Sequence, residues 1–253
     1  MLKTRVIPTL LLRGAGLVKT IRFRDPVYVG DPINAIRIFN DKEVDELVLL
    51  DITASRGNKG PAFSTIEKIA NECFMPVAYG GGISSMDEIR KVLSAGIEKV
   101  VINTAALMNP KFVRDAVKEF GSQAIVVSVD VKRTWRGRYE VYGDGGARPT
   151  GHEPVLFARQ MQDLGAGEIL LTAIDRDGTM KGYDIELIAR VTSTLSIPVI
   201  ACGGAGAIAD FGQAAEQGGA AAVAAGAMFV FHGRHRAVLI TYPSQAELAA
   251  VLN

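Results

Sequence analysis

The segment PVAYGGGISS at residues 76–85 decides the fold, because a closely similar segment, PVIACGGAGA, follows at residues 198–207. The two copies lie 122 positions apart, and two further pairs of segments share this offset. Three pairs at one offset indicate that the two halves of the chain have the same structure. The other pairs are ELVLLDITAS from residue 46 with EILLTAIDRD from residue 168, and GIEKVVINTAAL from residue 96 with GGAAAVAAGAMF from residue 218.

Short apolar segments alternate with amphipathic ones along the whole chain. The short segments are apolar at successive positions, which is typical of parallel strands buried on both faces. Helix start signals stand between them, such as Asp31-Pro32 and the Ser85 that precedes two acidic residues. Eight such βα units in about 250 residues match the size of a closed barrel. The expected strands are 5–8, 46–52, 76–79, 99–103, 124–130, 168–174, 198–202 and 221–225.

We therefore predict an α/β fold, a (β/α)8 TIM barrel with a two-fold internal repeat of half-barrels. A single domain is expected over residues 1–253, with half-barrels at about 1–121 and 122–253. The segment RYEVY followed by GDGG predicts a hairpin insertion at about 132–151, after the fifth strand. The glycine-flanked segment 13–30, after the first strand, is expected to be a loop.

The composition excludes several classes of protein. Hydrophobic residues make up 48% and charged residues 22% of the 253, as in ordinary globular proteins. The net charge of +1 argues against a mainly electrostatic nucleic-acid binder. Two distant cysteines, Cys73 and Cys202, exclude a disulfide framework and favour a reducing compartment. No apolar run reaches the roughly 18–20 residues of a membrane span, so we expect a cytoplasmic protein that binds neither nucleic acid nor membrane.

Glycines follow the third and the seventh expected strands, just before a helix in each repeat. Glycine there allows backbone N–H groups to approach an anion at a helix N-terminus, and barrel enzymes commonly bind phosphate in such loops. Two symmetry-related sites predict a ligand with a phosphate at each end; the alternative is that the glycines only form tight turns. The residues of the expected sites are Gly81, Gly82, Asn103 and Thr104 in the first half, and Asp177, Gly178, Gly203, Gly204, Ala225 and Gly226 in the second.

Carboxylates at strand ends are candidates for proton transfer, which needs a positioned acid or base. Asp130, within VVSVDVKR, is the best placed, and Asp51, Asp175 and Asp177 are further candidates, with loop bracing as the alternative role. Lys19 is placed to reach over a bound anion, although most loop lysines are simply solvated. We include Lys19 and Asp51 among the substrate-binding candidates. The histidines show no metal-ligand spacing, so we expect no metal and no cofactor.

Four charged residues each open an expected strand. Facing inward, they would form a ring of two cations and two anions at the N-terminal end of the barrel. Buried charges are costly unless they are paired, so such a ring must neutralise itself. It either closes the barrel with salt bridges or forms a polar gate on the barrel axis. The four residues are Arg5, Glu46, Lys99 and Glu168.

Over essentially its whole length the chain resembles the HisF family, the cyclase subunit of imidazole glycerol phosphate synthase. The resemblance implies a glutaminase subunit docked at the N-terminal face of the barrel. It further implies that ammonia passes along the axis, through a charged gate, to a bis-phosphorylated substrate. The matching segments are RVIP at 5–8, DELVLLDITAS at 45–55, YGGGI at 79–83, INTAAL at 102–107, FGSQAIVVSVDVKR at 120–133, LGAGEILL at 164–171, DRDGTMKGYD at 175–184 and PVIACGGAG at 198–206.

The resemblance also implies residue roles. The four strand-opening charges match the gate, Lys19 matches a loop lysine, and Asp130 matches one of two catalytic aspartates. The first phosphate site is matched by Gly82, Asn103 and Thr104, and the second by Asp177, Gly178, Gly204 and Ala225.

Two positions depart from the family's pattern. The family's first strand ends in Cys-Leu-Asp-Val, where this chain has Thr9-Leu10-Leu11-Leu12. Leu11 therefore stands where the second catalytic aspartate is expected, and leucine cannot transfer a proton. Gly226 stands where the family usually has a serine, which removes one hydroxyl donor.

A branch of the family associated with acetamidino modification of surface sugars resembles this chain more closely. The similar segments include YVGDPINA at 28–35 and FVFHGRHRAVLITYPS at 229–244. We therefore expect a barrel that passes glutamine-derived ammonia to a separate sugar amidotransferase. The alternatives are a working cyclase of histidine biosynthesis and a non-catalytic scaffold that activates the glutaminase. Fold alone would also allow a triose-phosphate-type isomerase, but two phosphate sites argue against a small mono-phosphate substrate.

Overall fold

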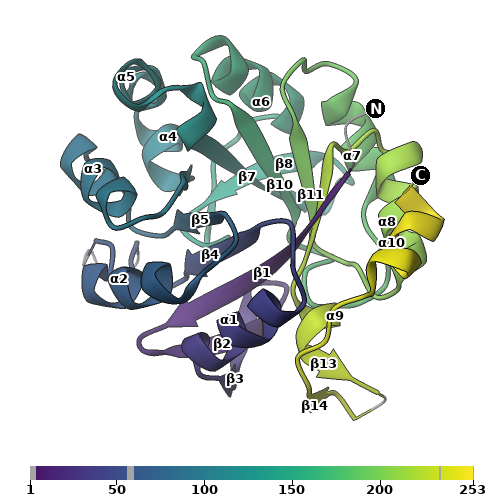
Figure 1. Ribbon diagram of the computed structural model, residues 1–253. Helices are drawn as coiled ribbons and strands as arrows, with labels where there is room; N and C mark the ends of the chain where they lie inside the picture. The colour runs from purple at the N-terminus through teal and green to yellow at the C-terminus, as the bar shows by residue number, and fades with distance from the viewer. Residues whose placement is uncertain (1–3, 56–59, 234, 253) are drawn as a thin grey trace.

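Eight parallel strands form a closed barrel in the computed structural model, which describes residues 4–55, 60–233 and 235–252. Each barrel strand pairs with the next one along the chain, and β12 pairs with β1 to close the ring. Helices surround the strands on the outside (Figure 1). The predicted (β/α)8 barrel is confirmed.

The barrel strands are β1 (Arg5–Arg13), β4 (Leu47–Asp51), β5 (Val77–Gly80), β6 (Lys99–Ile102), β7 (Ile125–Arg133), β10 (Glu168–Ala173), β11 (Val199–Cys202) and β12 (Ala222–Ala225). The helices that follow them are α1 (Pro32–Asp41), α2 (Phe63–Glu72), α3 (Met86–Ser94), α5 (Lys111–Phe120), α6 (Pro154–Asp163), α7 (Ile185–Thr192), α8 (Ile208–Glu216) and α10 (Gln245–Leu252). Shorter helical turns are α4 (Thr104–Met108), α9 (Ala227–Val230) and the 3-10 helix η1 (Ser122–Ala124).

The helix start signals in the sequence act as expected. The Asp31 side chain accepts a hydrogen bond from the backbone N–H of Asn34 at the start of α1. Ser85 and Glu88 form a capping box at the start of α3, in which each side chain binds the backbone N–H of the other residue. Such caps satisfy N–H groups that the first helical turn leaves unpaired.

The expected loop at residues 13–30 is instead an antiparallel hairpin. β1 continues to Arg13, and β2 (Gly16–Ile21) and β3 (Arg24–Gly30) follow it as paired strands. The turn between β2 and β3 has positive φ at both Arg22 and Phe23, the geometry of a tight two-residue hairpin turn. Its sequence lacks the glycine or asparagine that usually announces such a turn, so the hairpin signal is weak.

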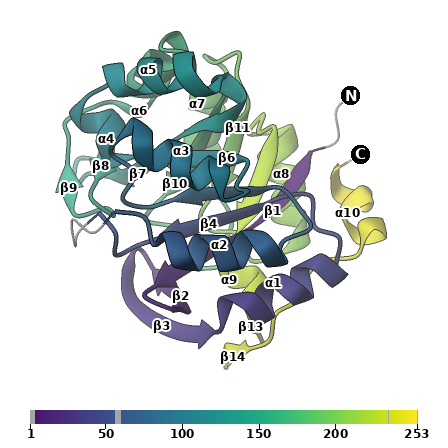
Figure 2. The same ribbon diagram turned by 60° about the vertical axis from the view of Figure 1, so that its left-hand side comes forward.

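Two more antiparallel insertions lie at the C-terminal ends of the barrel strands. β7 extends to Arg133 and pairs with β8 (Tyr139–Gly143), which pairs with the short β9 (Arg148–Pro149). The GDGG segment forms the turn from β8 to β9. β13 (Phe231–His232) pairs with β14 (Ala237–Val238) after β12. The hairpins β2–β3 and β13–β14 lie at the same end of the barrel (Figure 2).

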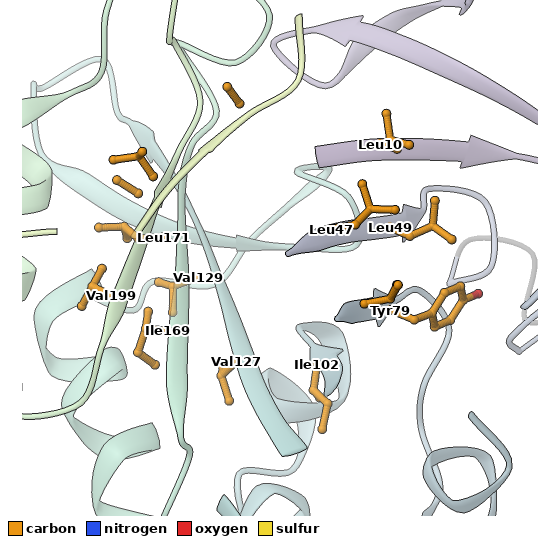
Figure 3. Packing of buried hydrophobic residues seen from close by; sticks show 14 of the residues in the cluster. Leu10, Leu47, Leu49, Tyr79, Ile102, Val127, Val129, Ile169, Leu171 and Val199 are labelled. Carbon is orange, nitrogen blue, oxygen red and sulfur yellow. The ribbon is translucent and has the colours of Figure 1, made fainter. Parts of the chain in front are cut away.

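Apolar side chains form two separate clusters, one on each side of the barrel wall. The larger cluster packs between strands and helices, and includes Leu47, Leu49, Val127 and Val129 (Figure 3). A smaller cluster of inward-facing residues, including Val48 and Val126, fills the barrel itself. Each strand therefore buries both faces, which explains its continuous apolar sequence.

The two halves repeat one another in backbone detail. A Cβ atom at Gly81 would lie 2.5 Å from the carbonyl oxygen of Asp51, and one at Gly203 would lie 2.7 Å from that of Ala173. Both glycines also have positive φ. The two close approaches are related by the 122-residue offset, so the same constraint fixes glycine in both halves.

Within the described residues, no helix has the length and apolar character needed to cross a membrane.

Candidate functional site

Alternate residues of each barrel strand face inward, because side chains of a strand point to opposite sides in turn. On β10 the inward stripe is Glu168, Leu170 and Thr172, and on β7 it ends in Ser128 and Asp130. One stripe thus carries a charge at the N-terminal end, an apolar residue in the middle and a polar group at the C-terminal end. The barrel axis is layered accordingly: a charged ring, an apolar layer and a polar pocket.

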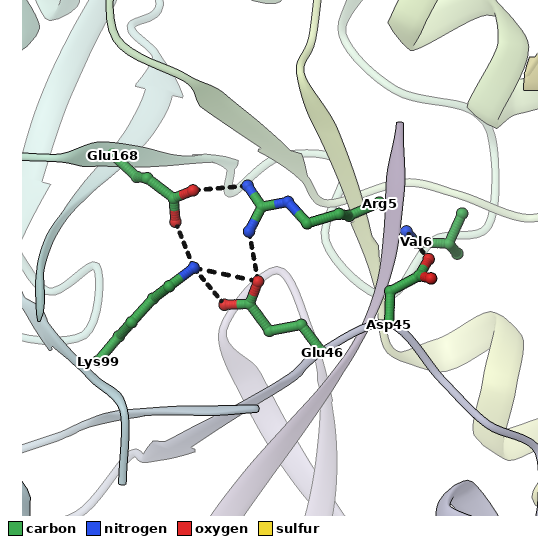
Figure 4. A network of polar contacts seen from close by, with 6 residues as sticks. All are labelled: Arg5, Val6, Asp45, Glu46, Lys99 and Glu168. Carbon is green, nitrogen blue, oxygen red and sulfur yellow. Dashed lines mark hydrogen bonds and ion pairs between the residues drawn. The ribbon is translucent and has the colours of Figure 1, made fainter. Parts of the chain in front are cut away.

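The charged ring contains the four residues that the sequence predicted (Figure 4). The Lys99 ammonium lies 3.0 Å from a carboxylate oxygen of both Glu46 and Glu168. The Arg5 guanidinium donates to Glu168 at 2.6 Å and to Glu46 as well. Two cations and two anions alternate in a closed cycle, so the ring is neutral.

Burial and pairing act on the ring together. The Glu46 side chain is only 3% exposed, against 28% for Arg5. Burial disfavours the charge of Arg5, but the carboxylates of Glu168 and Glu46 outweigh it and raise the pKa of Arg5. The four side chains contact one another across the N-terminal end of the barrel (Figure 4).

An apolar layer separates the ring from the opposite end. Its side chains are aliphatic apart from the Cys202 thiol, so the layer contains no strong hydrogen-bonding group that would hold water. Its members are Ile7, Val48, Leu50, Ala78, Val101, Val126, Leu170, Ile200, Cys202, Ala222 and Ala224.

A pocket at the C-terminal ends of the strands collects every residue that the sequence assigned to substrate binding or proton transfer except Asp175. Asp175 instead accepts a hydrogen bond from the backbone N–H of Arg133, at 2.8 Å, as a loop brace. The predicted residues in the pocket are Leu11, Lys19, Asp51, Gly81, Gly82, Asn103, Thr104, Asp130, Asp177, Gly178, Gly203, Gly204, Ala225 and Gly226.

Asp130 has the environment of a proton-transfer group. Burial raises the pKa of this carboxyl to about 7, although a hydrogen bond from the Ser128 hydroxyl, at 2.9 Å, opposes the shift. The negative charge of Asp177 raises it further. A carboxyl group with a pKa near neutrality can both donate and accept a proton at the working pH.

Asp51 has a different role in this structure. Its carboxylate accepts hydrogen bonds from the backbone N–H and hydroxyl of Thr53 and from the N–H of Ala54. It therefore braces the turn after β4, although it still borders the pocket.

Lys19 extends from β2 into the pocket and is buried. Its ammonium donates to the carbonyl oxygen of Thr9 at 2.5 Å. Burial lowers the pKa of Lys19 and raises the pKa of Asp177, and their mutual attraction offsets part of both shifts. Asp177 is also held by the Thr20 hydroxyl, at 3.2 Å.

The strand registers show that Leu11 and Asp130 occupy equivalent positions. Leu11 pairs with Leu50 across β1 and β4, and Asp130 pairs with Thr172 across β7 and β10. Leu50 and Thr172 are related by the 122-residue repeat. The first half-barrel therefore has an apolar side chain where the second half has its central carboxyl group.

Two residues earlier on each strand, the same comparison relates Thr9 to Ser128. The Ser128 hydroxyl donates to Asp130. The Thr9 hydroxyl is buried and has no hydrogen-bond partner among the described residues. A carboxylate at position 11 would supply the acceptor that Asp130 supplies in the other half.

Several pocket residues were missed by the sequence analysis. Ser55 lies in the turn after β4, and the others lie on the inward stripes of the strands or in the hairpin β2–β3. The period of two along each strand is the signal that could have found those on the strands. They are Thr9, Thr20, Phe23, Ser55, Ser128, Thr172 and Cys202. The described part of the chain contains no group of three His, Cys, Asp or Glu that could hold a metal ion.

The fold and pocket define a (β/α)8-barrel protein with a polar site at the C-terminal ends of its strands, where barrel enzymes carry their active sites. A family model described as histidine biosynthesis protein matches residues 5–235. The chain belongs to this family and, within it, to the HisF group of imidazole glycerol phosphate synthase subunits.

Three relatives show the extent of the similarity. A protein of Pseudomonas aeruginosa, provisionally named imidazole glycerol phosphate synthase subunit hisF2, is 52% identical over 98% of this chain and 99% of its own length. A provisionally named HisF subunit of Leptospira interrogans is 46% identical over 99% of both chains. The imidazole glycerol phosphate synthase subunit HisF of Alkaliphilus metalliredigens is 44% identical over 92% of both.

Proposed function

We propose that this barrel receives glutamine-derived ammonia from a glutaminase subunit and passes it along its axis for the amidation of a surface sugar. The glutaminase would dock at the N-terminal face, where the ring of Arg5, Glu46, Lys99 and Glu168 closes the axis. Ammonia is small and neutral, so the apolar layer above the ring would let it pass while excluding ions. The pocket at the far end would retain a bis-phosphate-type site formed by the paired glycine turns.

The observation that carries this proposal is Leu11. The cyclase reaction of the family's pattern uses a pair of aspartates, and here one of the two equivalent positions is apolar. The ring and pocket glycines are present, whereas one proton-transfer group is absent. That combination favours a retained ammonia route over retained cyclase chemistry. The sugar-amidation role is further supported by the resemblance of segments 28–35 and 229–244 to the branch with that association.

The test is ammonia-dependent cyclisation of the bis-phosphate intermediate of histidine biosynthesis, measured for the purified protein beside a Leu11→Asp variant. We expect the wild type to be slower than an ordinary enzyme by about 10²–10⁴-fold, the usual contribution of one acid–base group. The Leu11→Asp variant should regain activity. Wild-type turnover on the order of 1 s⁻¹ or faster would contradict the proposal.

A second candidate function is an active cyclase of histidine biosynthesis. It is favoured by Asp130, whose pKa of about 7 suits proton transfer, and by the name of the Alkaliphilus metalliredigens relative. Under this alternative the wild type would cyclise the substrate at ordinary rates. A Glu46→Gln substitution in the ring distinguishes both candidates from a scaffold that only activates the glutaminase. If ammonia passes through the ring, the substitution should change the rate of amidation or cyclisation. If the barrel is only a scaffold, that rate should stay the same.

A further inference from the structure

Three antiparallel insertions surround the C-terminal mouth of the barrel: residues 13–30, 132–151 and 231–239, here called the mouth insertions. The first contains the hairpin β2–β3, the second β8 and β9, and the third β13 and β14. They are the parts of the fold that a plain βα repeat does not require. Their position around one opening suggests a common role.

Contacts tie the mouth insertions to the pocket rim. The backbone N–H of Arg22 donates to the carbonyl oxygen of Asp177 at 2.9 Å, and the Arg236 guanidinium donates to that of Gly178 at 3.2 Å. Phe23 lines the pocket, and a Cβ atom at Gly146 would lie 2.8 Å from its ring. All three insertions therefore meet at the edge of the pocket.

The mouth insertions are strongly basic. They contain eleven Lys and Arg residues and three Asp and Glu residues, a net charge of +8. The whole chain has a net charge of +1, so the rest of the molecule has a net charge of −7. Lys19 is buried in the pocket, and the other residues of the insertions carry a net charge of +7. A charge distribution this asymmetric attracts an acidic partner to the mouth and repels it from the other faces.

The mouth insertions also expose apolar side chains. Among the described residues, nine large hydrophobic side chains are exposed, and six of them lie in these three segments. Trp135 is 87% exposed and stacks on the Arg136 guanidinium, whose centre lies 4.5 Å from the ring centroid. The six residues are Ile21, Val27, Tyr28, Trp135, Val238 and Leu239. Exposed aromatic and apolar groups among arginines are typical of protein–protein contact surfaces.

We propose that the mouth insertions form the docking surface for the enzyme that consumes the ammonia, and that this enzyme presents an acidic, partly apolar surface around the entrance to its own active site. This inference rests on the proposed function. Ammonia that reaches water at neutral pH is protonated and loses its nucleophilic lone pair, so a transfer between two active sites needs a covered junction. The apolar side chains would exclude water there, while the cations guide the partner into register.

The hydrogen bonds and ion pairs of the arginines favour a protein as the binding partner over a nucleic acid or a membrane. Three of the nine arginines in these segments are engaged within the protein itself: Arg22 and Arg236 donate to backbone carbonyls, and Arg133 pairs with Glu186. This leaves fewer cations for the many phosphate contacts that a polyanion makes. Electrostatic steering of a small anionic substrate would account for the charge, but not for the exposed apolar side chains. The fixed cations and apolar groups together match a surface of defined shape.

The test uses the barrel–glutaminase complex and a purified sugar amidotransferase, with the double substitution Trp135→Glu and Leu239→Glu in the barrel. Leu156→Glu on α6 is the matched control, because Leu156 is 70% exposed but lies outside the mouth insertions. We expect the double variant to bind the amidotransferase at least about tenfold more weakly and to lose glutamine-driven amidation to the same extent. Glutaminase activation and amidation driven by added ammonium chloride should be unchanged, as should every property of Leu156→Glu.

Equal binding by wild type and double variant would overturn the docking surface. So would binding of duplex DNA or phosphatidylglycerol vesicles at physiological salt that the double substitution abolishes, since the surface would then serve a polyanion. Wild-type binding without ammonia transfer would contradict the proposed function but retain the surface. Ammonia transfer that the double substitution leaves unchanged would support the proposed function but overturn the docking surface.

Discussion

A Cβ atom at Gly226 would lie 1.8 Å from the Nζ of Lys19. The lysine therefore occupies the space that any larger residue at position 226 would need. This relationship connects two features that the sequence presents separately: a lysine that extends into the pocket, and a glycine in place of the family's usual serine. In this chain the amine of that lysine lies at the point where the family's usual hydroxyl group is missing.

The close approach predicts an energetic coupling between the two residues. Gly226→Ala should destabilise the protein by about 1–3 kcal/mol, because overpacking forces Lys19 from its bond to the Thr9 carbonyl. In a Lys19→Ala background only the contact with the Thr9 carbonyl oxygen, 2.8 Å from the Cβ position, remains, so the same substitution should cost less. The expected coupling energy is about 1 kcal/mol. Urea unfolding of the four proteins of this cycle measures it. An equal cost in both backgrounds would show that Lys19 does not hold this position.

The charged ring predicts that removing one partner of a buried ion pair costs much more stability than removing one partner of an exposed pair. Glu46→Gln leaves Arg5 and Lys99 with a single carboxylate, so we expect a loss of about 2–4 kcal/mol in the free energy of unfolding. Glu72→Gln removes the partner of Arg37, whose side chain is 61% exposed, and should change the free energy of unfolding far less, because solvent screens this pair. Chemical denaturation of both variants at the same pH tests this. A loss of similar size for the two would mean that the ring is solvated.

Much of the fold could be predicted because buried parallel strands carry an unambiguous pattern. Residues 47–50 and 169–171 are apolar in unbroken succession, and the 122-residue repeat relates the two strands to each other. The hairpin β2–β3 could not be predicted, since the residues at its turn, Arg22 and Phe23, are poor turn formers whose positive φ depends on contacts with the turn after β10. The conformational preferences of the turn residues alone do not reveal such tertiary contacts.

The candidate site was predicted through its glycines and strand-end charges, which are visible one residue at a time. The pocket hydroxyls were not predicted, because Thr9 and Thr172 can be recognised as pocket residues only once the inward-facing side of each strand is known. The position of the Lys19 amine was also beyond the sequence. Its bond to the Thr9 carbonyl depends on how β2 folds back along β1, and that hairpin was itself unexpected.

The unpartnered hydroxyl of Thr9 predicts a substitution effect that changes sign. In the wild type, Thr9→Val removes a buried hydroxyl that has no partner among the described residues, so it should be neutral or stabilise by up to about 1 kcal/mol. In a Leu11→Asp background the hydroxyl gains an acceptor, as Ser128 has in Asp130, and Thr9→Val should destabilise by about 1–2 kcal/mol. Chemical denaturation of these variants gives both values. The same sign in both backgrounds would contradict the equivalence of the two half-barrels at this layer.

The raised pKa of Asp130 predicts how stability depends on pH. In the unfolded chain an aspartate ionises near its ordinary value of 3.8, whereas burial keeps the folded carboxyl protonated up to about pH 7. The folded state thus binds more protons between these values, and its stability falls as the pH rises from about 4 to about 7. Asp130→Asn removes this term and can still accept the Ser128 hydrogen bond. Relative to the wild type, the variant should gain about 2–4 kcal/mol in the free energy of unfolding between pH 4 and pH 8.

Urea unfolding at pH 4, 6 and 8 measures the gain, with Asp115→Asn on the exposed face of α5 as the control. Because the Asp115 side chain is 56% exposed, its substitution should shift stability by less than about 0.5 kcal/mol at every pH. A difference between Asp130→Asn and wild type that stays constant across the three pH values would show that Asp130 is ionised throughout. It would then be a fixed anion near Asp177, and proton transfer in the pocket would need another group.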